Sequence, residues 1–338
     1  MTNSDQVLAG AIPSAAAVED ARRLLRDQLP ETRQIAARRL GSHLGVRVQL
    51  KLEAELPTGS FKPRGALYAL ARRLRGGAVR EVVASSTGNH GAAVAWAARA
   101  LGVPATVFLP ERPNPVKRRA IAELGATIRE TGPDLAAAAR AAREHSAGDE
   151  VYYLDDATDP VLPAGPATIA VEILERAPET RSLVVPMGDT ALIRGVGAVA
   201  KRHDREVAII GVQAERAPSY YLSWKNGRPV ATATCHTIAD GLATRTPVAE
   251  NVQAIRSLVD DVVLVSEDDL LDAVAWLILE EHVVAEPSGA AAVAAALALG
   301  RSALPGPAVL LVTGANLSES VLAAVGATRR RRPGMAPE

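Results

Sequence analysis

The chain has 338 residues, of which 48% are hydrophobic and 22% charged, enough for one large or two medium globular domains. Lysine plus arginine and aspartate plus glutamate balance at 38 each, which excludes a broad basic surface for nucleic acid and favours a small ligand. The single cysteine, Cys235, excludes an intrachain disulfide framework. Because the N-terminus lacks a signal-like pattern and no uncharged apolar run reaches about 18 residues, we expect a cytoplasmic protein that is neither exported nor membrane-spanning.

Short β-branched runs alternate with longer alanine-, leucine- and arginine-rich stretches of helical spacing. This alternation is typical of an α/β fold with mostly parallel strands. The expected strands are 46–53, 81–85, 105–109, 126–129, 182–187, 207–212, 262–265 and 308–312. The expected helices include 92–101, 114–124, 134–145, 166–177, 270–281 and 289–299.

Two interruptions of this pattern predict domain boundaries. A glycine pair follows residue 75, and polar turn formers cluster at 155–160. The intervening segment carries its own strands and helices, so we expect a small domain, 76–157, inserted in a large one, 1–75 plus 158–328. Residues 329–338 combine arginines with proline and glycine, which predicts a disordered basic tail.

Lys62 is the first candidate for chemistry. It lies in Ser-Phe-Lys-Pro-Arg-Gly-Ala (60–66), just past a strand-like run and a Pro-Thr-Gly break, at the expected first turn of a helix. An ammonium buried there loses solvation, and a lowered pKa would provide the neutral amine that attacks a carbonyl or holds a Schiff base. A lone lysine is more often a surface residue, so this interpretation depends on the other motifs.

Polar residues at 85–91, Ser-Ser-Thr-Gly-Asn-His-Gly, lie between the expected strand 81–85 and the helix 92–101. Ligands bind at the carboxyl ends of strands in such sheets, and a helix N-terminus offers free N–H groups to an anion such as a carboxylate. A simple N-cap with a glycine turn would explain one serine and one glycine, but not this density of donors.

Two weaker motifs have the same form. A small-residue loop, 188–192, follows the expected strand 182–187 and could aim backbone N–H groups at a phosphate, although it lacks a known nucleotide-binding spacing. Thr313 ends the expected strand 308–312 and could meet a heterocycle, although such threonines more often satisfy the backbone.

Together the four motifs resemble the fold-type II pyridoxal phosphate enzymes, in particular their serine/threonine dehydratase and serine racemase branch, within the tryptophan synthase beta superfamily. The resemblance runs from about residue 30 to residue 325, and its most specific element is 51–66. Matches at 86–91, 185–188, 237–241 and 285–290 follow in the family's order. The resemblance implies two open, twisted, mostly parallel sheets flanked by helices, an amino-acid substrate and a homodimer.

The resemblance also implies a role for each matching residue. Lys62 would bind pyridoxal 5'-phosphate and then remove the substrate's α-proton, with Phe61 against the pyridine ring, Asn89 on the phenolic oxygen and Thr313 facing the ring nitrogen. The implied cofactor-binding residues are Phe61, Lys62, Asn89, Gly188, Asp189, Thr190, Ala191, Leu192, Gly241, Glu286 and Thr313. The implied substrate-binding residues are Ser86, Thr87, Asn89 and His90.

The implied reaction is β-elimination, the dehydration and deamination of a 3-hydroxy amino acid such as serine or threonine to a 2-oxo acid and ammonia. Racemases of the branch carry a serine, the acid on the opposite face, where this chain has Thr87, so Thr87 is a second candidate catalytic residue and racemisation stays open. β-Replacement, as in threonine synthases, and a non-catalytic protein of the same fold are further alternatives.

Besides Thr87, the chain departs from the family in two further places. The phosphate loop is usually four glycines and a branched residue, whereas Asp189, Thr190 and Ala191 replace three of the glycines here. A carboxylate beside a phosphate dianion would cost several kcal/mol unless its side chain turned away. Gln213 and Ser219 replace the two carboxylates of the racemases' metal site, so we expect no metal ion.

Overall fold

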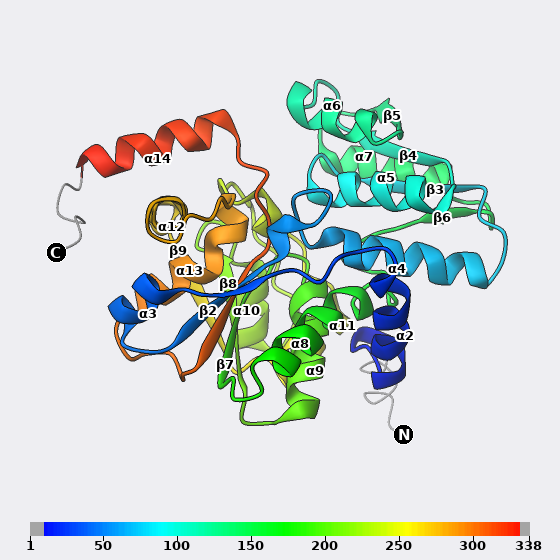
Figure 1. Ribbon diagram of the computed structural model, residues 1–338. Coiled ribbons are helices and arrows are strands. Elements are labelled where there is room, and N and C mark those ends of the chain that lie inside the picture. Colours follow the sequence, from blue (N-terminus) through cyan, green and yellow to red (C-terminus); the bar gives the residue numbers. More distant parts are fainter. Residues whose placement is uncertain (1–9, 332–338) are drawn as a thin grey trace.

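The strands of the protein form two separate sheets in the computed structural model, which describes residues 10–331 (Figure 1). The larger sheet has the order β1-β2-β10-β7-β8-β9, and only its β1–β2 pair is antiparallel. The smaller sheet has the order β5-β4-β3-β6 and is parallel throughout. The strands are β1 (Gln34–Ala36), β2 (Val48–Leu52), β3 (Glu81–Ser85), β4 (Ala105–Leu109), β5 (Thr127–Glu130), β6 (Val151–Tyr153), β7 (Ser182–Pro186), β8 (Ala208–Ala214), β9 (Asp261–Val265) and β10 (Ala308–Val312).

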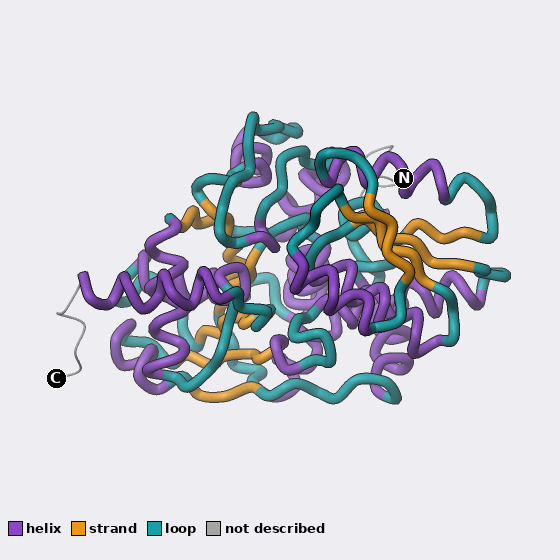
Figure 2. Tube along the Cα trace, turned by 90° about the horizontal axis from the view of Figure 1, so that it is seen from above, coloured by secondary structure: helices purple, strands orange, loops and turns teal. Residues whose placement is uncertain are grey.

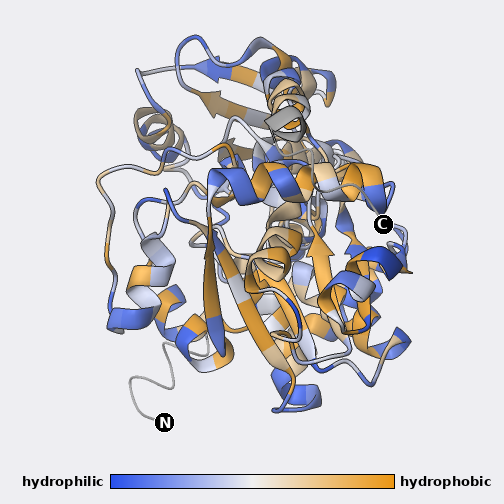
Figure 3. Cartoon of the chain, turned by 90° about the vertical axis from the view of Figure 1, so that its left-hand side faces the viewer, coloured by the Kyte–Doolittle hydropathy of each residue, from blue (hydrophilic) through white to orange (hydrophobic). Residues whose placement is uncertain are grey.

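The composition of the central strands follows from their burial. All five residues of β7 and of β10 are buried, as expected where helices cover both faces of a parallel sheet. Figure 3 shows the strands of the larger sheet coloured hydrophobic along much of their length, with hydrophilic residues toward the outside. The flanking helices are α2 (Ala15–Arg26), α3 (Arg38–Leu44), α4 (Lys62–Arg75), α5 (Asn89–Leu101), α6 (Pro115–Glu123), α7 (Leu135–His145), α8 (Ala164–Arg176), α9 (Ala191–His203), α10 (Ser219–Asn226), α11 (Ala249–Leu258), α12 (Glu267–Glu280), α13 (Pro287–Leu299) and α14 (Glu319–Arg331).

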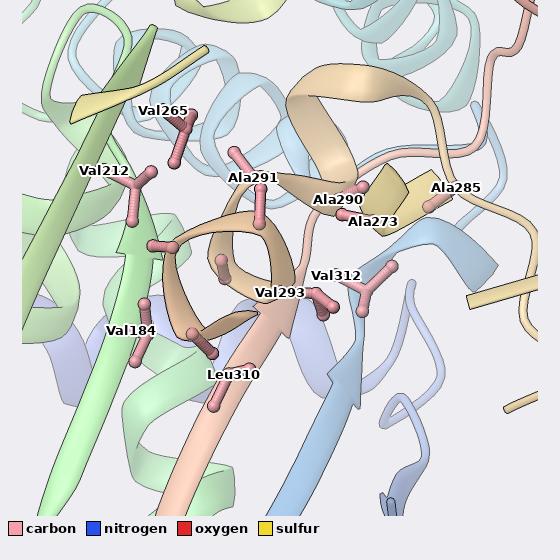
Figure 4. Close-up of a cluster of buried hydrophobic side chains, with 14 of the residues drawn as sticks. Val184, Val212, Val265, Ala273, Ala285, Ala290, Ala291, Val293, Leu310 and Val312 are labelled. Carbon is pink, nitrogen blue, oxygen red and sulfur yellow. The ribbon is translucent and has the colours of Figure 1, made fainter. Parts of the chain in front are cut away.

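One face of the larger sheet packs on α13, whose alanine-rich sequence lets its backbone approach closely. Figure 4 shows its side chains surrounded by Val184 of β7, Val212 of β8 and Leu310 of β10. The opposite face packs on α8, α9 and α11 through residues such as Leu183 and Val309. Burial of apolar surface on both faces stabilises the sheet by roughly 25 cal/mol for each Å² removed from water.

The smaller sheet lies between α5 on one face and α7 on the other. Figure 2 shows its strands as a group apart from those of the larger sheet. Helix α4 packs against both α5 and α8, and so against elements that cover the two different sheets. The first residue of α4, Lys62, therefore starts a helix that joins the two halves of the fold.

The expected elements agree with the observed ones to within a few residues, but two short strands, β1 and β6, were not expected. All strands of the smaller sheet fall within 76–157, while the division into two domains stays a prediction. The disordered tail was wrong for 329–331, because α14 continues to Arg331, and 332–338 lie outside the described residues. Within 10–331 the structure has no helix long and apolar enough to cross a membrane.

Candidate active site

Lys62 is fixed by backbone contacts between its own segment and the end of β10. Ser60 forms an isolated bridge with Gly314, and the N–H of Phe61 donates to the carbonyl of Thr313 at 3.0 Å. Helix α4 then begins at Lys62, as the sequence predicted. The backbone that leads into Lys62 is thereby held against Thr313, at the carboxyl end of a central parallel strand, where ligands bind in α/β sheets.

The Nζ of Lys62 donates to Oδ2 of Asp156, which lies just after β6. Both side chains are 18% exposed, so the ion pair is largely removed from water. Sequence reasoning missed Asp156 and treated it as one of several turn formers. The available signal was a pair of aspartates directly after a strand, which went unused because the three-residue strand β6 was not recognised.

The pKa of Lys62 is raised, contrary to the expectation from the sequence. Burial does act to lower this pKa, but the negative charges of Asp156 and, to a smaller extent, Asp189 outweigh it. The pKa of Asp156 moves the opposite way. Burial acts to raise it, while His90 and Lys62 bring it well below its usual value, so Asp156 is a carboxylate at neutral pH.

His90 approaches the same carboxylate oxygen of Asp156 as Lys62 does. Its Nε2 is 2.8 Å from the carbonyl oxygen of Leu154, and its Nδ1 is 3.8 Å from Oδ2 of Asp156. A carbonyl oxygen only accepts, so Nε2 carries a hydrogen and Nδ1 is the ring nitrogen that faces the carboxylate. The structure therefore places His90 against Asp156 and Leu154, and its assignment to the substrate carboxylate stays a prediction.

The turn before α5 presents the other residues of this motif. Ser86 and Thr87 are half-buried, and the N–H of Gly88 donates to Oγ of Ser86 at 3.2 Å. Within the described residues, no side chain caps the first turn of α5. Its N–H groups can therefore bind an anion such as a substrate carboxylate.

Asn89 belongs to a hydrogen-bonded cluster that links the two halves of the fold. Its Nδ2 donates to Oε1 of Glu286 at 2.6 Å, and its Oδ1 accepts from Nδ2 of Asn316 at 2.7 Å. Burial raises the pKa of Glu286. A Cβ at Gly314 would lie 2.3 Å from Oε1 of Glu286, so the end of β10 approaches this cluster closely. Two predicted cofactor-binding residues, Asn89 and Glu286, thus lie together.

The predicted phosphate loop leads into α9. A Cβ at Gly188 would lie 2.2 Å from the carbonyl oxygen of Gly241, which explains the glycine and brings the 237–241 motif to the loop. Thr190 has φ +72°, and Ala191 then opens the helix. The free N–H groups of the first turn of α9 provide a site for an anion.

Two charged side chains distinguish this loop from a run of glycines. Oδ1 of Asp189 accepts from Oγ1 of Thr244 at 3.0 Å, and burial together with the charge of Asp156 raises the pKa of Asp189 to about 6. Arg194, which sequence reasoning missed, is 2% exposed, and its Nε donates to Oγ1 of Thr190 at 3.1 Å. Its Nη1 donates to a backbone carbonyl at 2.7 Å, while its Nη2 has no partner among the described residues.

We expect Asp189→Asn to stabilise the folded protein more at high pH than at low pH. The pKa of Asp189 is about 6 in the folded protein, above that of an aspartate in the unfolded chain, which is about 4. The free energy of unfolding therefore falls as the pH rises from about 4 to about 6, and the loss is complete above the folded pKa. The amide keeps an acceptor for Thr244 and cannot ionise. Urea unfolding should show a gain on the order of 2 kcal/mol at pH 8 and little at pH 4.

The exposed Asp149 provides the control for this comparison. Asp149→Asn should change the unfolding midpoint equally little at both pH values. An Asp189→Asn gain of the same size at pH 4 and pH 8 would show that Asp189 does not titrate as described.

Comparison with known proteins identifies the class. Residues 25–314 match the family model described as pyridoxal-phosphate dependent enzyme. The chain is 33% identical over 308 residues to an L-threonine ammonia-lyase of Geobacter sulfurreducens, covering 91% of this chain and 77% of the relative. It is 35% identical over 280 residues to an L-threonine ammonia-lyase of Thermotoga maritima, covering 83% and 70%. The chain therefore belongs to the pyridoxal-phosphate dependent enzymes.

Solved structures define the branch. Threonine deaminase isoform 2 from Solanum lycopersicum superimposes with a TM-score of 0.85 at 27% identity, covering 95% of this chain and 90% of that one. The threonine deaminase from T.th. gives a TM-score of 0.83 at 31% identity, covering 90% and 99%. Maize serine racemase, at 23% identity, shares the fold. The protein is a fold-type II enzyme of the serine/threonine dehydratase-like branch, and its cofactor is pyridoxal 5'-phosphate.

The residues of this chain fit that cofactor despite the altered loop. The unpartnered Nη2 of the buried Arg194 is a cationic donor beside the loop, and burial lowers the pKa of Arg194 only to about 10. The raised pKa of Asp189 gives its carboxyl a neutral form that would not repel a phosphate. The cost expected for a charged Asp189 is therefore reduced by its own protonation.

Proposed function

We propose that the protein is a pyridoxal-phosphate-dependent ammonia-lyase that converts a 3-hydroxy amino acid, such as serine or threonine, to a 2-oxo acid and ammonia. The observation that carries this proposal is Lys62 at the start of α4, tied to the end of β10 and facing the acidic side chain of Asp156. The printed names of the Geobacter sulfurreducens and Thermotoga maritima relatives support the reaction type.

The cofactor, when bound, supplies an electron-withdrawing ring that makes the substrate's α-carbon acidic. Lys62 would hold it through Nζ, the loop 188–192 and Arg194 would hold its phosphate, and Asn89 and Thr313 would face its ring. Nζ of Lys62 is the base placed to take the α-proton. The uncapped start of α5, with Ser86 and Thr87, would orient the substrate carboxylate.

Contacts across the two sheets support exclusion of water from the reaction. Besides the Asn89–Glu286 hydrogen bond, Nζ of Lys117 in α6 donates to the carboxylate of Asp240, which lies within the 237–241 motif. These contacts hold elements of the small sheet against the large one. They suit a carbanion reaction, which needs a site closed to solvent.

Three further assignments belong to the same proposal. The small domain comprises 76–157 and the large one 1–75 plus 158–328, which agrees with the division of the strands between the two sheets. We also propose a cytoplasmic protein, in keeping with its single cysteine, and a homodimer, in keeping with the family. Size-exclusion chromatography with light scattering tests the dimer.

An assay of L-serine, L-threonine and bulkier 3-hydroxy amino acids tests the reaction. We expect 2-oxo acid and ammonia in equal amounts from at least one of them, because the released enamine hydrolyses to these products. If a substrate is racemised and no ammonia is released, the protein would be a racemase and not a lyase, with Thr87 as the acid on the opposite face.

A further inference from the structure

A primary ammonium already binds the carboxylate of Asp156. Nζ of Lys62 donates to Oδ2 of Asp156, and each of the two side chains is only 18% exposed. The lysine side chain is an alkyl chain that ends in an ammonium, the same group that a basic amino acid would bring into this site. The contact therefore shows which ligand chemistry this carboxylate accepts.

Lys62 is the cation that hydrogen-bonds Asp156. Within the described part of the chain, the other group that forms an ion pair with Asp156 is His90, whose Nδ1 lies 3.8 Å from Oδ2, beyond the length of a hydrogen bond. The adjacent carboxylate, Asp155, bonds Arg143 at 2.9 Å and so has its own cation. When Lys62 is engaged in chemistry, Asp156 is left as a shielded carboxylate without a bonded cation, an arrangement that costs free energy.

The contact with Asp156 also opposes the role proposed for Lys62. As a base, Nζ of Lys62 must be neutral before it takes the α-proton. Burial acts to lower the pKa of Lys62, but Asp156 and the other nearby carboxylates raise this pKa on balance and favour the ammonium. A second cation that took over Asp156 would therefore release the base.

The proposed role of Lys62 also places Asp156 within reach of a substrate side chain. To take the α-proton, Nζ must come within about 3.5 Å of the α-carbon. A hydrogen-bonded oxygen lies about 3 Å from Nζ, so Oδ2 of Asp156 is within about 7 Å of the α-carbon. An ammonium on the γ-carbon of the substrate covers most of this distance, and a hydrogen bond covers the rest.

We propose that Asp156 selects a substrate whose side chain carries an ammonium, namely a 3-hydroxy amino acid with an amino group on its γ-carbon, 2,4-diamino-3-hydroxybutanoate. The inference rests on the proposed function and narrows its substrate class. The γ-ammonium takes the place of the Lys62 ammonium on Oδ2, so Nζ loses the contact that holds its proton and becomes available as the base.

The reaction of this substrate keeps the γ-amino group. The α-proton goes to Nζ of Lys62, and the β-hydroxyl leaves with the electron pair of its bond to carbon and, with one proton, becomes water. Hydrolysis of the released enamine consumes one water and breaks the bond between the α-carbon and its nitrogen. The products are 4-amino-2-oxobutanoate and ammonia, with no net change in water.

Three substrates with one carbon skeleton test selection by charge. Threonine has a methyl group as its γ-carbon, 2,4-diamino-3-hydroxybutanoate carries a γ-ammonium, and 3-hydroxyaspartate carries a γ-carboxylate. The release of 2-oxo acid by the holoenzyme at pH 7 gives kcat/KM for each, in matched configurations. We expect the ammonium substrate to exceed threonine by about tenfold to a hundredfold, the usual gain from a hydrogen bond between charged groups. 3-Hydroxyaspartate should fall below threonine, because Asp156 repels its carboxylate.

Variants at Asp156 assign this preference to its carboxylate. Asp156→Asn should bring the ratio of kcat/KM for the ammonium substrate to that for threonine close to one, because an amide has no charge to attract the ammonium. Asp156→Glu keeps the charge and should keep the order of the three substrates. Asp155→Asn is the matched control: it removes a carboxylate that Arg143 already neutralises, and it should leave the ratio unchanged. The absorption of the bound cofactor at the edge of the visible range reports whether the site is intact in each variant.

The outcomes separate this inference from the proposed function. A wild-type protein that deaminates threonine at least as well as the ammonium substrate would overturn the inference and uphold the lyase. A preference for the ammonium substrate that persists in Asp156→Asn would overturn it too, because another group would then select the charge. Release of 2-oxo acid from none of the three substrates or from serine would refute the proposed function itself, and the inference with it.

Discussion

Lys62→Ala is expected to abolish both ammonia release and the absorption band that the bound cofactor gives at the edge of the visible range. The substitution removes the amine that we propose to hold the cofactor and to take the α-proton, so activity should fall by at least about a thousandfold. It also leaves Asp156 without the ammonium that lowers its pKa. Absorbance spectra of the purified protein and an ammonia assay measure the two effects.

Two further variants separate covalent attachment from charge. Lys62→Arg keeps a cation near Asp156, but its guanidinium stays protonated and does not form an imine with the cofactor. This variant should therefore lose the absorption and the activity as well. Lys201→Ala removes another partly buried lysine, in the last turn of α9 and about ten residues from the phosphate loop, and should keep both. Cofactor absorption that survives in Lys62→Ala would show that another residue holds the cofactor.

Much of the site was predictable because its residues are adjacent in sequence to strong signals. Lys62 follows a Pro-Thr-Gly break, and residues 85–91 follow a buried strand whose bounds were predicted correctly. Parallel strands bring their carboxyl ends to one edge, so motifs distant in the chain could be assigned to one site before the structure was known. Local pattern and sheet topology are sufficient for this part of the prediction.

The rest depends on contacts between residues far apart in the chain. The sequence indicated the burial of Lys62 but not its neutralising partner Asp156, 94 residues later, and therefore the predicted direction of its pKa shift was wrong. Arg194 looks like an ordinary helical arginine in the sequence, and its 2% exposure results from the packing of α9 within the fold. The pKa values of these side chains depend on residues that are distant in the sequence, and a local sequence pattern does not contain those residues.

Arg64→Met is expected to destabilise the folded protein by about 3–5 kcal/mol. The Arg64 side chain is 2% exposed and its Nε and Nη2 donate to the two oxygens of Glu53 at 2.8 and 3.0 Å, while Nη2 also donates to Glu172 at 2.9 Å. Burial acts to lower the pKa of Arg64, but the charges and hydrogen bonds of Glu53 and Glu172 together outweigh it and raise this pKa. Methionine fills much of the same space yet leaves the buried carboxylate of Glu53 without its cation, while Glu172 keeps its ion pair with Lys51. Urea unfolding measures the loss.

The exposed pair Arg33–Glu55 supplies the matched control, because it is also an arginine–glutamate ion pair. Arg33→Met should leave the midpoint of unfolding nearly unchanged, since water replaces the lost partner. Adding Glu53→Gln to Arg64→Met should restore part of the stability, because a neutral amide replaces the buried charge and can still bond the hydroxyl of Thr32, now 2.6 Å from Oε1 of Glu53. If the double variant were no more stable than Arg64→Met alone, the loss would come from packing, and charge burial would not be its cause.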